Sequence, residues 1–130
     1  MMYQSQFLVG SGSNADIDTS EEDIVTVTDE TKLKVSQLSL FVAYALGTNT
    51  SLTLRAYARS DKAGDWHAIP KQNLADNTID AWSFVIDANT PATPIVIDLA
   101  IGAYMAFKVT GQGAGGANST STIKILGRDN

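Results

Sequence analysis

The sequence predicts an all-β protein: a single antiparallel β-sandwich of the jelly-roll or Greek-key type, with eight or nine strands and an extended N-terminal arm. Three observations predict this class. The chain has 130 residues, close to the commonest size of one domain. Most segments alternate apolar with polar residues and are rich in Thr, Val, Ile and Tyr. Turn residues separate these segments at short spacing, which is typical of a two-sheet sandwich.

Each predicted strand places its apolar residues on one face. Residues 23–28 and 51–59 show the pattern first, and residues 95–101, 104–109 and 121–126 repeat it. The core-facing positions that this alternation predicts are Leu52, Leu54, Ala56, Ala58, Ile95, Ile97, Leu99, Ile101, Met105, Phe107, Val109, Ile123 and Ile125. Residues 79–87 are apolar on both faces, so we expect a central strand there.

Residues 31–47 fit two kinds of element. Their alternation slips by one position at Ser36 and Gln37, which a β-bulge would absorb. The same segment also has helical spacing, with Gly47 as a possible end. We expect a strand, because the flanking segments are strands.

Residues 1–22 are expected to form an N-terminal arm and linker, and residues 23–130 the sandwich domain. The first residues read as a short strand-like run, followed by a Gly-Ser linker and an acidic stretch. Such a run is too apolar to stay in water at the end of a linker. Tyr3, Phe7 and Val9 are therefore expected to bind a partner, by adding a strand to a neighbouring subunit or packing on it.

Composition limits the partners and the compartment. The chain has 9 Lys and Arg against 14 Asp and Glu, a net charge of -5, which is the wrong sign for binding a nucleic-acid backbone. It has no cysteine, and therefore no disulfide or thiolate site. No apolar run approaches the roughly 20 residues of a membrane-spanning helix, and the first residues lack the features of a signal peptide. We expect a protein made in the cytoplasm, with neither membrane nor nucleic acid as a partner.

Residues 54–70 hold the single histidine and are the candidate segment for catalytic residues. His67 has Ser60, Asp61 and Asp65 nearby in the sequence, but their spacing matches no local nucleophile motif. The Ser, Asp and Gly content of residues 60–65 is that of a tight turn. We therefore expect a hairpin here, and no enzyme.

The acidic and glycine-rich segments do not predict a bound metal or cofactor. When the acidic stretch is read as a calcium loop from Asn14, Thr19 stands where glycine is needed and Val25 where the closing glutamate is needed. The glycines of residues 111–116 are not followed by Gly-Lys-Ser/Thr and join two predicted strands, so they do not form a phosphate loop. No cofactor and no metal are expected.

Carbohydrate binding is the alternative function. Jelly-roll modules bind sugars with exposed aromatic side chains, and Tyr57, Trp66 and His67 are candidates for such a site. The exposure of Trp66 tests carbohydrate binding, because a tryptophan buried under the hairpin could not serve as a platform for a sugar.

Several segments together resemble the small β-sandwich virion proteins of tailed bacteriophages, above all the head decoration or cement proteins. They are the strand-turn-strand of residues 52–70, the late strand of residues 103–113, the Gly-rich connection and the terminal residues 121–130. The resemblance spans residues 32–130 and implies a non-enzymatic protein on the capsid surface of the virion. It implies the major capsid protein as partner, stabilised contacts between neighbouring capsid subunits, and a homo-oligomer, with a trimer favoured. The resemblance carries over no functional residue. For the alternative function it implies a carbohydrate-binding jelly-roll module of a phage tail or fibre.

Overall fold

The computed structural model describes residues 5–28, 37–60, 64–73, 78–91, 94–99, 104–113 and 117–129. The described residues form eleven strands: β1 (Ser5–Ala15), β2 (Glu22–Val27), β3 (Gln37–Ala45), β4 (Asn49–Arg59), β5 (His67–Ala68), β6 (Pro70–Asn73), β7 (Thr78–Ala81), β8 (Ser83–Asp87), β9 (Ile95–Leu99), β10 (Tyr104–Gly113) and β11 (Thr120–Asp129). They include no helix, and so none long and apolar enough to cross a membrane.

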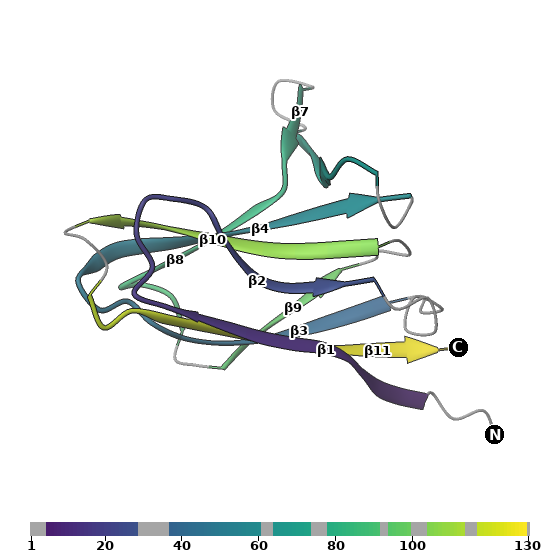
Figure 1. The fold of residues 1–130 in the computed structure, drawn as a ribbon, viewed down its shortest axis with the longest axis horizontal. Coiled ribbons are helices and arrows are strands. Elements are labelled where there is room, and N and C mark those ends of the chain that lie inside the picture. Colours follow the sequence, from purple (N-terminus) through teal and green to yellow (C-terminus); the bar gives the residue numbers. More distant parts are fainter. Residues whose placement is uncertain are drawn as a thin grey trace.

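The strands form a jelly roll, which confirms the predicted fold class. One sheet, here called sheet A, has the order β1-β11-β3-β9, and the other, sheet B, has the order β2-β10-β4 with both β8 and β5 along the outer side of β4. All pairs are antiparallel. The strands of the two sheets alternate along the chain in pairs: β1 with β2, β3 with β4, β8 with β9 and β10 with β11. Figure 1 shows the two sheets stacked, with β1 and β2 nearest the viewer. This winding of eight strands into two sheets defines the jelly roll.

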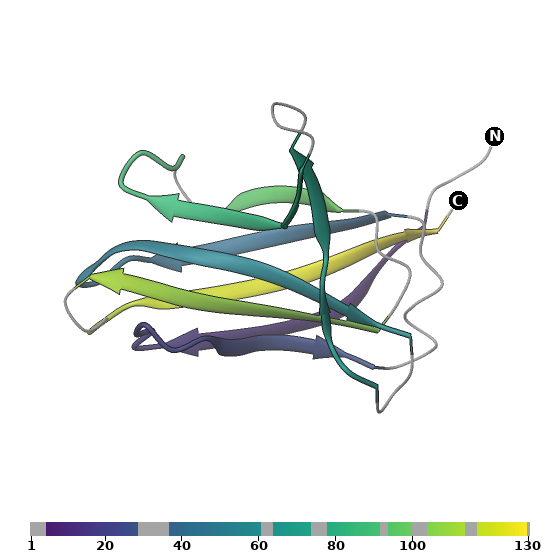
Figure 2. The same ribbon diagram turned by 90° about the horizontal axis from the view of Figure 1, so that it is seen from above.

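A two-stranded hairpin adds to the predicted count of eight or nine strands. β6 and β7 pair with each other, from Pro70 opposite Ala81 to Asn73 opposite Thr78, and with no other described strand. Figures 1 and 2 show this hairpin standing away from the sandwich. At its base the N–H of Trp82 donates to the carbonyl of Ile69 over 2.7 Å, and the N–H of Ile69 donates to the carbonyl of Ala56 over 3.0 Å.

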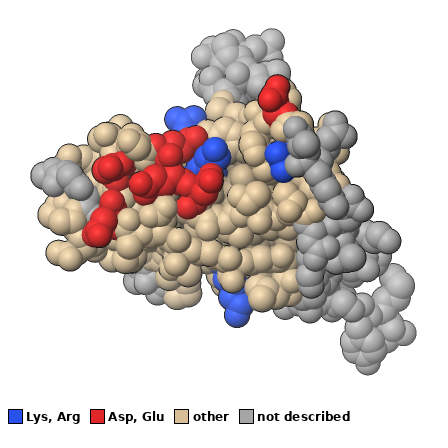
Figure 3. Space-filling model, viewed as in Figure 1, with Lys and Arg blue, Asp and Glu red and all other residues tan. Residues whose placement is uncertain are grey.

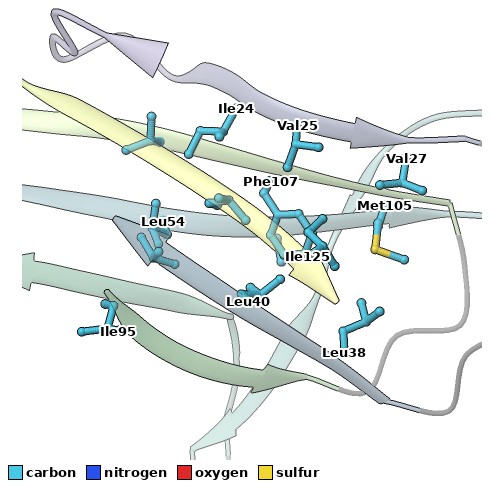
Figure 4. Packing of buried hydrophobic residues seen from close by; sticks show 14 of the residues in the cluster. Ile24, Val25, Val27, Leu38, Leu40, Leu54, Ile95, Met105, Phe107 and Ile125 are labelled. Atoms are coloured by element: carbon cyan, nitrogen blue, oxygen red, sulfur yellow. The ribbon is translucent and has the colours of Figure 1, made fainter. Parts of the chain in front are cut away.

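The core between the sheets follows the predicted alternation. Residues of β2, β4 and β10 in sheet B meet those of β3 and β11 in sheet A there. Figure 4 shows Phe107 and Met105 pointing toward Leu38, Leu40 and Ile125. The predicted core positions that are buried are Leu52, Leu54, Ala56, Ile95, Met105, Phe107, Val109, Ile123 and Ile125. Ala58 and Ile97 are half-buried. Ile101 and the side chain of Leu99 lie outside the described residues.

The expectation of an arm over residues 1–22 is wrong for residues 5–15. β1 pairs with β11 along its length, from Ser5 opposite Asp129 to Ala15 opposite Thr120, with a register shift between Leu8 and Gly10. The glycines that looked like a linker allow β2 to approach. A Cβ on Gly12 would stand 2.0 Å from the carbonyl oxygen of Ile24. The sandwich therefore includes a strand before residue 23.

Two further strand predictions have different outcomes. β3 is a strand, as expected for this part of residues 31–47, and its pairing with β11 and β9 is regular. The proposed bulge at Ser36 lies outside the described residues. The central strand expected over residues 79–87 is wrong, because the run divides at Trp82 between β7 of the hairpin and β8 at the edge of sheet B. Its apolar residues on both faces belong to two elements and do not mark a doubly buried strand.

Candidate partner-binding face

The outer face of sheet B carries charged and aromatic side chains that bind one another. The hydroxyl of Tyr57 donates to the carboxylate of Glu21, with oxygen distances of 2.8 and 2.9 Å. Nζ of Lys108 lies 5.2 Å from the centre of the Tyr57 ring and 3.5 Å from Oδ1 of Asp23. Figure 3 shows acidic side chains gathered on the edge of the sandwich where β1 and β2 lie, with lysine and arginine next to them. Most of the polar groups of this cluster are therefore already engaged within the chain.

The environment of Tyr57 changes its acidity. Partial burial raises the pKa of the Tyr57 phenol, and the hydrogen bond to Glu21 and the charge of Glu21 raise it further. The positive charge of Arg55 opposes this shift. The phenol therefore stays protonated to higher pH than an ordinary tyrosine and keeps its hydrogen bond to Glu21, which makes it a structural link from sheet B to the β1–β2 connection.

Trp66 and His67 lie on the strand-turn-strand that the sequence predicted. β5 pairs with β4, His67 opposite Ala58, which confirms the hairpin. The guanidinium carbon of Arg59 lies 4.2 Å from the centre of the Trp66 ring, and Nη1 of Arg59 donates to the carbonyl of Gly64 over 3.2 Å. Trp66 is half-buried and His67 is exposed. Arg59 therefore covers one face of the tryptophan that a sugar would need.

Of the three residues expected to form the binding arm, the structure describes the side chain of Val9. Tyr3 and the side chain of Phe7 lie outside the described residues. Val9 is buried, with 6% of its surface exposed, and belongs to the hydrophobic core. Val9 therefore stabilises the sandwich and cannot contact a partner.

The acidic segment is held by its own backbone contacts. Oδ1 of Asp16 accepts from the N–H of Asn118 over 3.1 Å, and Oδ1 of Asp18 accepts from the N–H of Ser20 over 2.8 Å. In the described part of the chain no group of three or more His, Asp or Glu side chains is arranged to hold a metal ion. The two carboxylates instead fix the connection between β1 and β2.

The outer face of sheet A carries an apolar band that the sequence analysis missed. Leu8 on β1 is paired with Leu126 on β11, and Phe41 on β3 is paired with Val96 on β9. Leu126 and Phe41 are diagonal neighbours, because Phe41 pairs with Lys124 two residues earlier in β11. Leu8 and Val96 are 46% and 55% exposed, and Leu126 and Phe41 are half-buried. These four residues, the apolar band, cross all four strands of sheet A.

Most described neighbours of the apolar band are uncharged. The other outward positions of sheet A whose side chains are described are Ser11, Ser13, Ala15, Gln37, Ser39, Ala43, Ala45, Thr120, Thr122 and Lys124. Among these described positions Lys124 carries the one charge. Phe41 could have indicated the band, because it is an apolar residue at an outward position of a regularly alternating strand. The residues that lie beside it on the neighbouring strands follow only from the register.

Among solved structures, this chain has structural neighbours. No protein-family model matches the sequence, and no curated protein matches it. The crystal structure of the SPBc2 prophage-derived protein YomS is similar to this chain, with 17% sequence identity, coverage of 96% of each chain and a TM-score of 0.46. What this protein binds therefore has to be inferred from its own surface.

Proposed function

We propose that this protein is a non-enzymatic virion structural protein, which binds the capsid surface and stabilises contacts between neighbouring capsid subunits. The observation that carries the proposal is the apolar band on the outer face of sheet A. A surface with exposed leucine, valine and a half-buried phenylalanine, and with one charge among its described neighbours, is suited to the core of a protein–protein contact. The major capsid protein as its partner follows from the resemblance of the sequence to head decoration proteins.

The fold is compatible with this proposal but does not select it, because jelly rolls occur in both capsid proteins and lectins. The contacts of the aromatic residues favour the structural function. Arg59 stacks on Trp66, and Glu21 and Lys108 engage Tyr57. A carbohydrate platform at these residues would first have to displace the contacts that the chain makes with itself.

A particle-binding experiment tests the band. Particles lacking the protein are mixed with purified protein and separated on a gradient, and the bound protein is measured relative to the major capsid protein. Leu8→Glu and Val96→Glu are expected to weaken binding by at least about tenfold, since each places a charge in the contact. Val85→Glu is the matched control, because Val85 is 53% exposed on the outer face of sheet B.

Circular dichroism and thermal unfolding establish that all three variants are folded. Loss of occupancy with Leu8→Glu and Val96→Glu, together with full occupancy of Val85→Glu, supports the proposal. Full occupancy of both band variants, or an equal loss with Val85→Glu, contradicts it.

A further inference from the structure

β9 is one of the two edge strands of sheet A, and β1 is the other. β9 pairs with β3, from Leu38 opposite Leu99 to Val42 opposite Ile95, and no other described strand pairs with its outer side. An unpaired edge presents a row of backbone donors and acceptors to which another strand can add.

The other edges carry features that oppose strand addition. β1 has a register shift and lies close against β2, where Gly12 approaches Ile24. β2 has a register shift of its own and carries Glu22 and Asp23. β5 has two residues, and β8 is preceded directly by the base of the projecting hairpin. β9 contains no lysine and no proline, its one charged residue is Asp98, and its pairing with β3 shows no shift. Natural sheets use such features to block edge pairing, and β9 is the edge that carries the fewest of them.

Side-chain exposure points to the same edge. Ile97 stands in the core-facing row, opposite Leu40, which is fully buried, yet Ile97 is half-buried. Val96, beside it, is 55% exposed on the outer face. The apolar band therefore extends to the edge strand of sheet A, where its last residue is the exposed Val96.

We propose that β9 pairs with β9 of a second copy of this chain, antiparallel and centred on Ile97, so that two four-stranded sheets form one sheet of eight strands. In this register Ile97 lies opposite Ile97 of the second copy. Ile95 lies opposite Leu99 of the second copy, and Val96 opposite Asp98. A two-fold axis at Ile97 relates the copies, and the same strand serves on both sides of the contact. The dimer goes beyond the proposed function and does not depend on it.

The sequence of β9 favours a second copy over another protein. Ile95 and Ile97 are core-facing, and Leu99 holds the next position of the same row by its register opposite Leu38. Every residue pair across the seam in this row therefore joins two apolar residue types. Asp98 of one copy lies directly opposite Val96 of the second copy. The two Asp98 residues are only diagonal neighbours, so like charges are not directly opposed. A shift by one residue would place core-facing residues opposite outward ones, so the alternation opposes such a shift.

Single cysteines test this register, because the natural chain has none. Residues opposite each other at an antiparallel seam have Cα atoms about 4.5 to 5.5 Å apart, within the range that a disulfide bridges. Oxidised Ile97→Cys is therefore expected to lose its monomer band and run as a covalent dimer on a non-reducing gel. Val96→Cys is the control within the same strand. The two copies of residue 96 lie two register positions apart, beyond roughly 7 Å, so this more exposed cysteine should stay monomeric.

A mixed experiment avoids substitution of the half-buried isoleucine. Val96→Cys mixed with Asp98→Cys should form a covalent dimer that contains one copy of each variant. Failure of both Ile97→Cys and this mixture to cross-link overturns the proposal, as does equally fast cross-linking of Val96→Cys or of Val85→Cys on β8. Cross-linking of Ile97→Cys to a capsid protein in place of itself also overturns it. Leu8 is three strands from β9, so Leu8→Glu tests particle binding without touching the dimer seam.

Discussion

The side-chain amide of Asn49 donates a hydrogen bond of 2.8 Å to the backbone carbonyl of Ile17, and both residues are buried. Around this contact, the N–H of Ile17 donates to the hydroxyl of Ser119 over 2.7 Å, and the N–H of Gly111 donates to the carbonyl of Asp18 over 2.6 Å. The β1–β2 connection, the start of β4 and the β10–β11 connection are therefore joined at one end of the jelly roll by two buried side-chain hydrogen bonds.

Replacement of Asn49 by alanine is expected to lower the free energy of unfolding by about 2 kcal/mol, because the carbonyl of Ile17 would remain buried without a donor. Denaturant unfolding followed by circular dichroism measures this change. Thr50→Ala is the matched control. The Thr50 hydroxyl donates to the carbonyl of Gln112 over 3.0 Å, but at an exposed site, so its loss should cost less than about 0.5 kcal/mol. Equal effects of the two substitutions would show that the buried contact contributes nothing beyond a surface one.

Gly12→Ala is expected to destabilise the protein by at least about 2 kcal/mol, because its Cβ would stand 2.0 Å from the backbone oxygen of Ile24 and would force β1 and β2 apart. Ser11→Ala, at the preceding exposed position, should leave the free energy of unfolding within about 0.5 kcal/mol of the wild-type value. Thermal or denaturant unfolding compares the two. If residues 1–22 were an independent arm, both substitutions would be neutral, so this pair of variants also tests the place of β1 in the sandwich.

The alternation of the sequence was sufficient to predict the two sheets and most of their inner faces. Leu52 and Leu54, Met105 and Phe107, and the isoleucines of β11 point inward because every second residue of a regular strand faces the core. The inward or outward direction of a residue follows from its own strand, so it can be predicted without knowing which strands pair. The same reasoning predicted the β4–β5 hairpin from its turn residues.

The features that were not predicted, the strand β1 and the apolar band, depend on pairing between distant segments. β1 looked like a linker because Gly10 and Gly12 break its alternation, and only the approach of β2 explains why glycine is needed there. The apolar band was missed for a related reason. Leu8 and Val96 are 88 positions apart (96 − 8) and join one surface only through the register of β1, β11, β3 and β9. No local pattern contains that register.

The stability of the protein is expected to fall above about pH 10 in a way that depends on Tyr57. The pKa of the Tyr57 phenol is raised in the folded protein, so the unfolded chain releases this proton first as the pH rises. The contribution of Tyr57 is therefore fully present below the ordinary tyrosine pKa of about 10 and is lost as the pH passes through the raised value. The free energy of unfolding of the wild type and of Tyr57→Phe should be compared between about pH 8 and pH 11.

The wild type should lose stability more steeply with pH than Tyr57→Phe over this range. Glu21→Gln removes the charge and weakens the hydrogen bond that raise the pKa, so its pH dependence should be intermediate. Identical pH profiles of the wild type and Tyr57→Phe would show that the phenol titrates alike in the folded and unfolded chains.

Removal of the β6–β7 hairpin is expected to leave the jelly roll folded. β6 and β7 form a sheet of their own, and an isolated two-stranded hairpin is marginally stable at best in water, so the sandwich gains little from it. The base is already closed, because the N–H of Trp82 donates to the carbonyl of Ile69 and Pro70 lies opposite Ala81. Residues 71–80 can therefore be replaced by Asn-Gly, which suits a two-residue turn between antiparallel strands.

The shortened protein should keep the far-UV spectrum of the wild type and a free energy of unfolding within about 1 kcal/mol of it, since closing a shorter loop also costs slightly less entropy. Ile69→Ala is the contrasting variant at the base of the hairpin. Ile69 packs against the core and donates its N–H to Ala56, so truncation of its side chain should cost about 1 kcal/mol or more even with the hairpin intact. The opposite result would be a shortened protein that fails to fold and an Ile69→Ala variant as stable as the wild type. It would mean that the hairpin stabilises the sandwich and that Ile69 at the base of the hairpin does not.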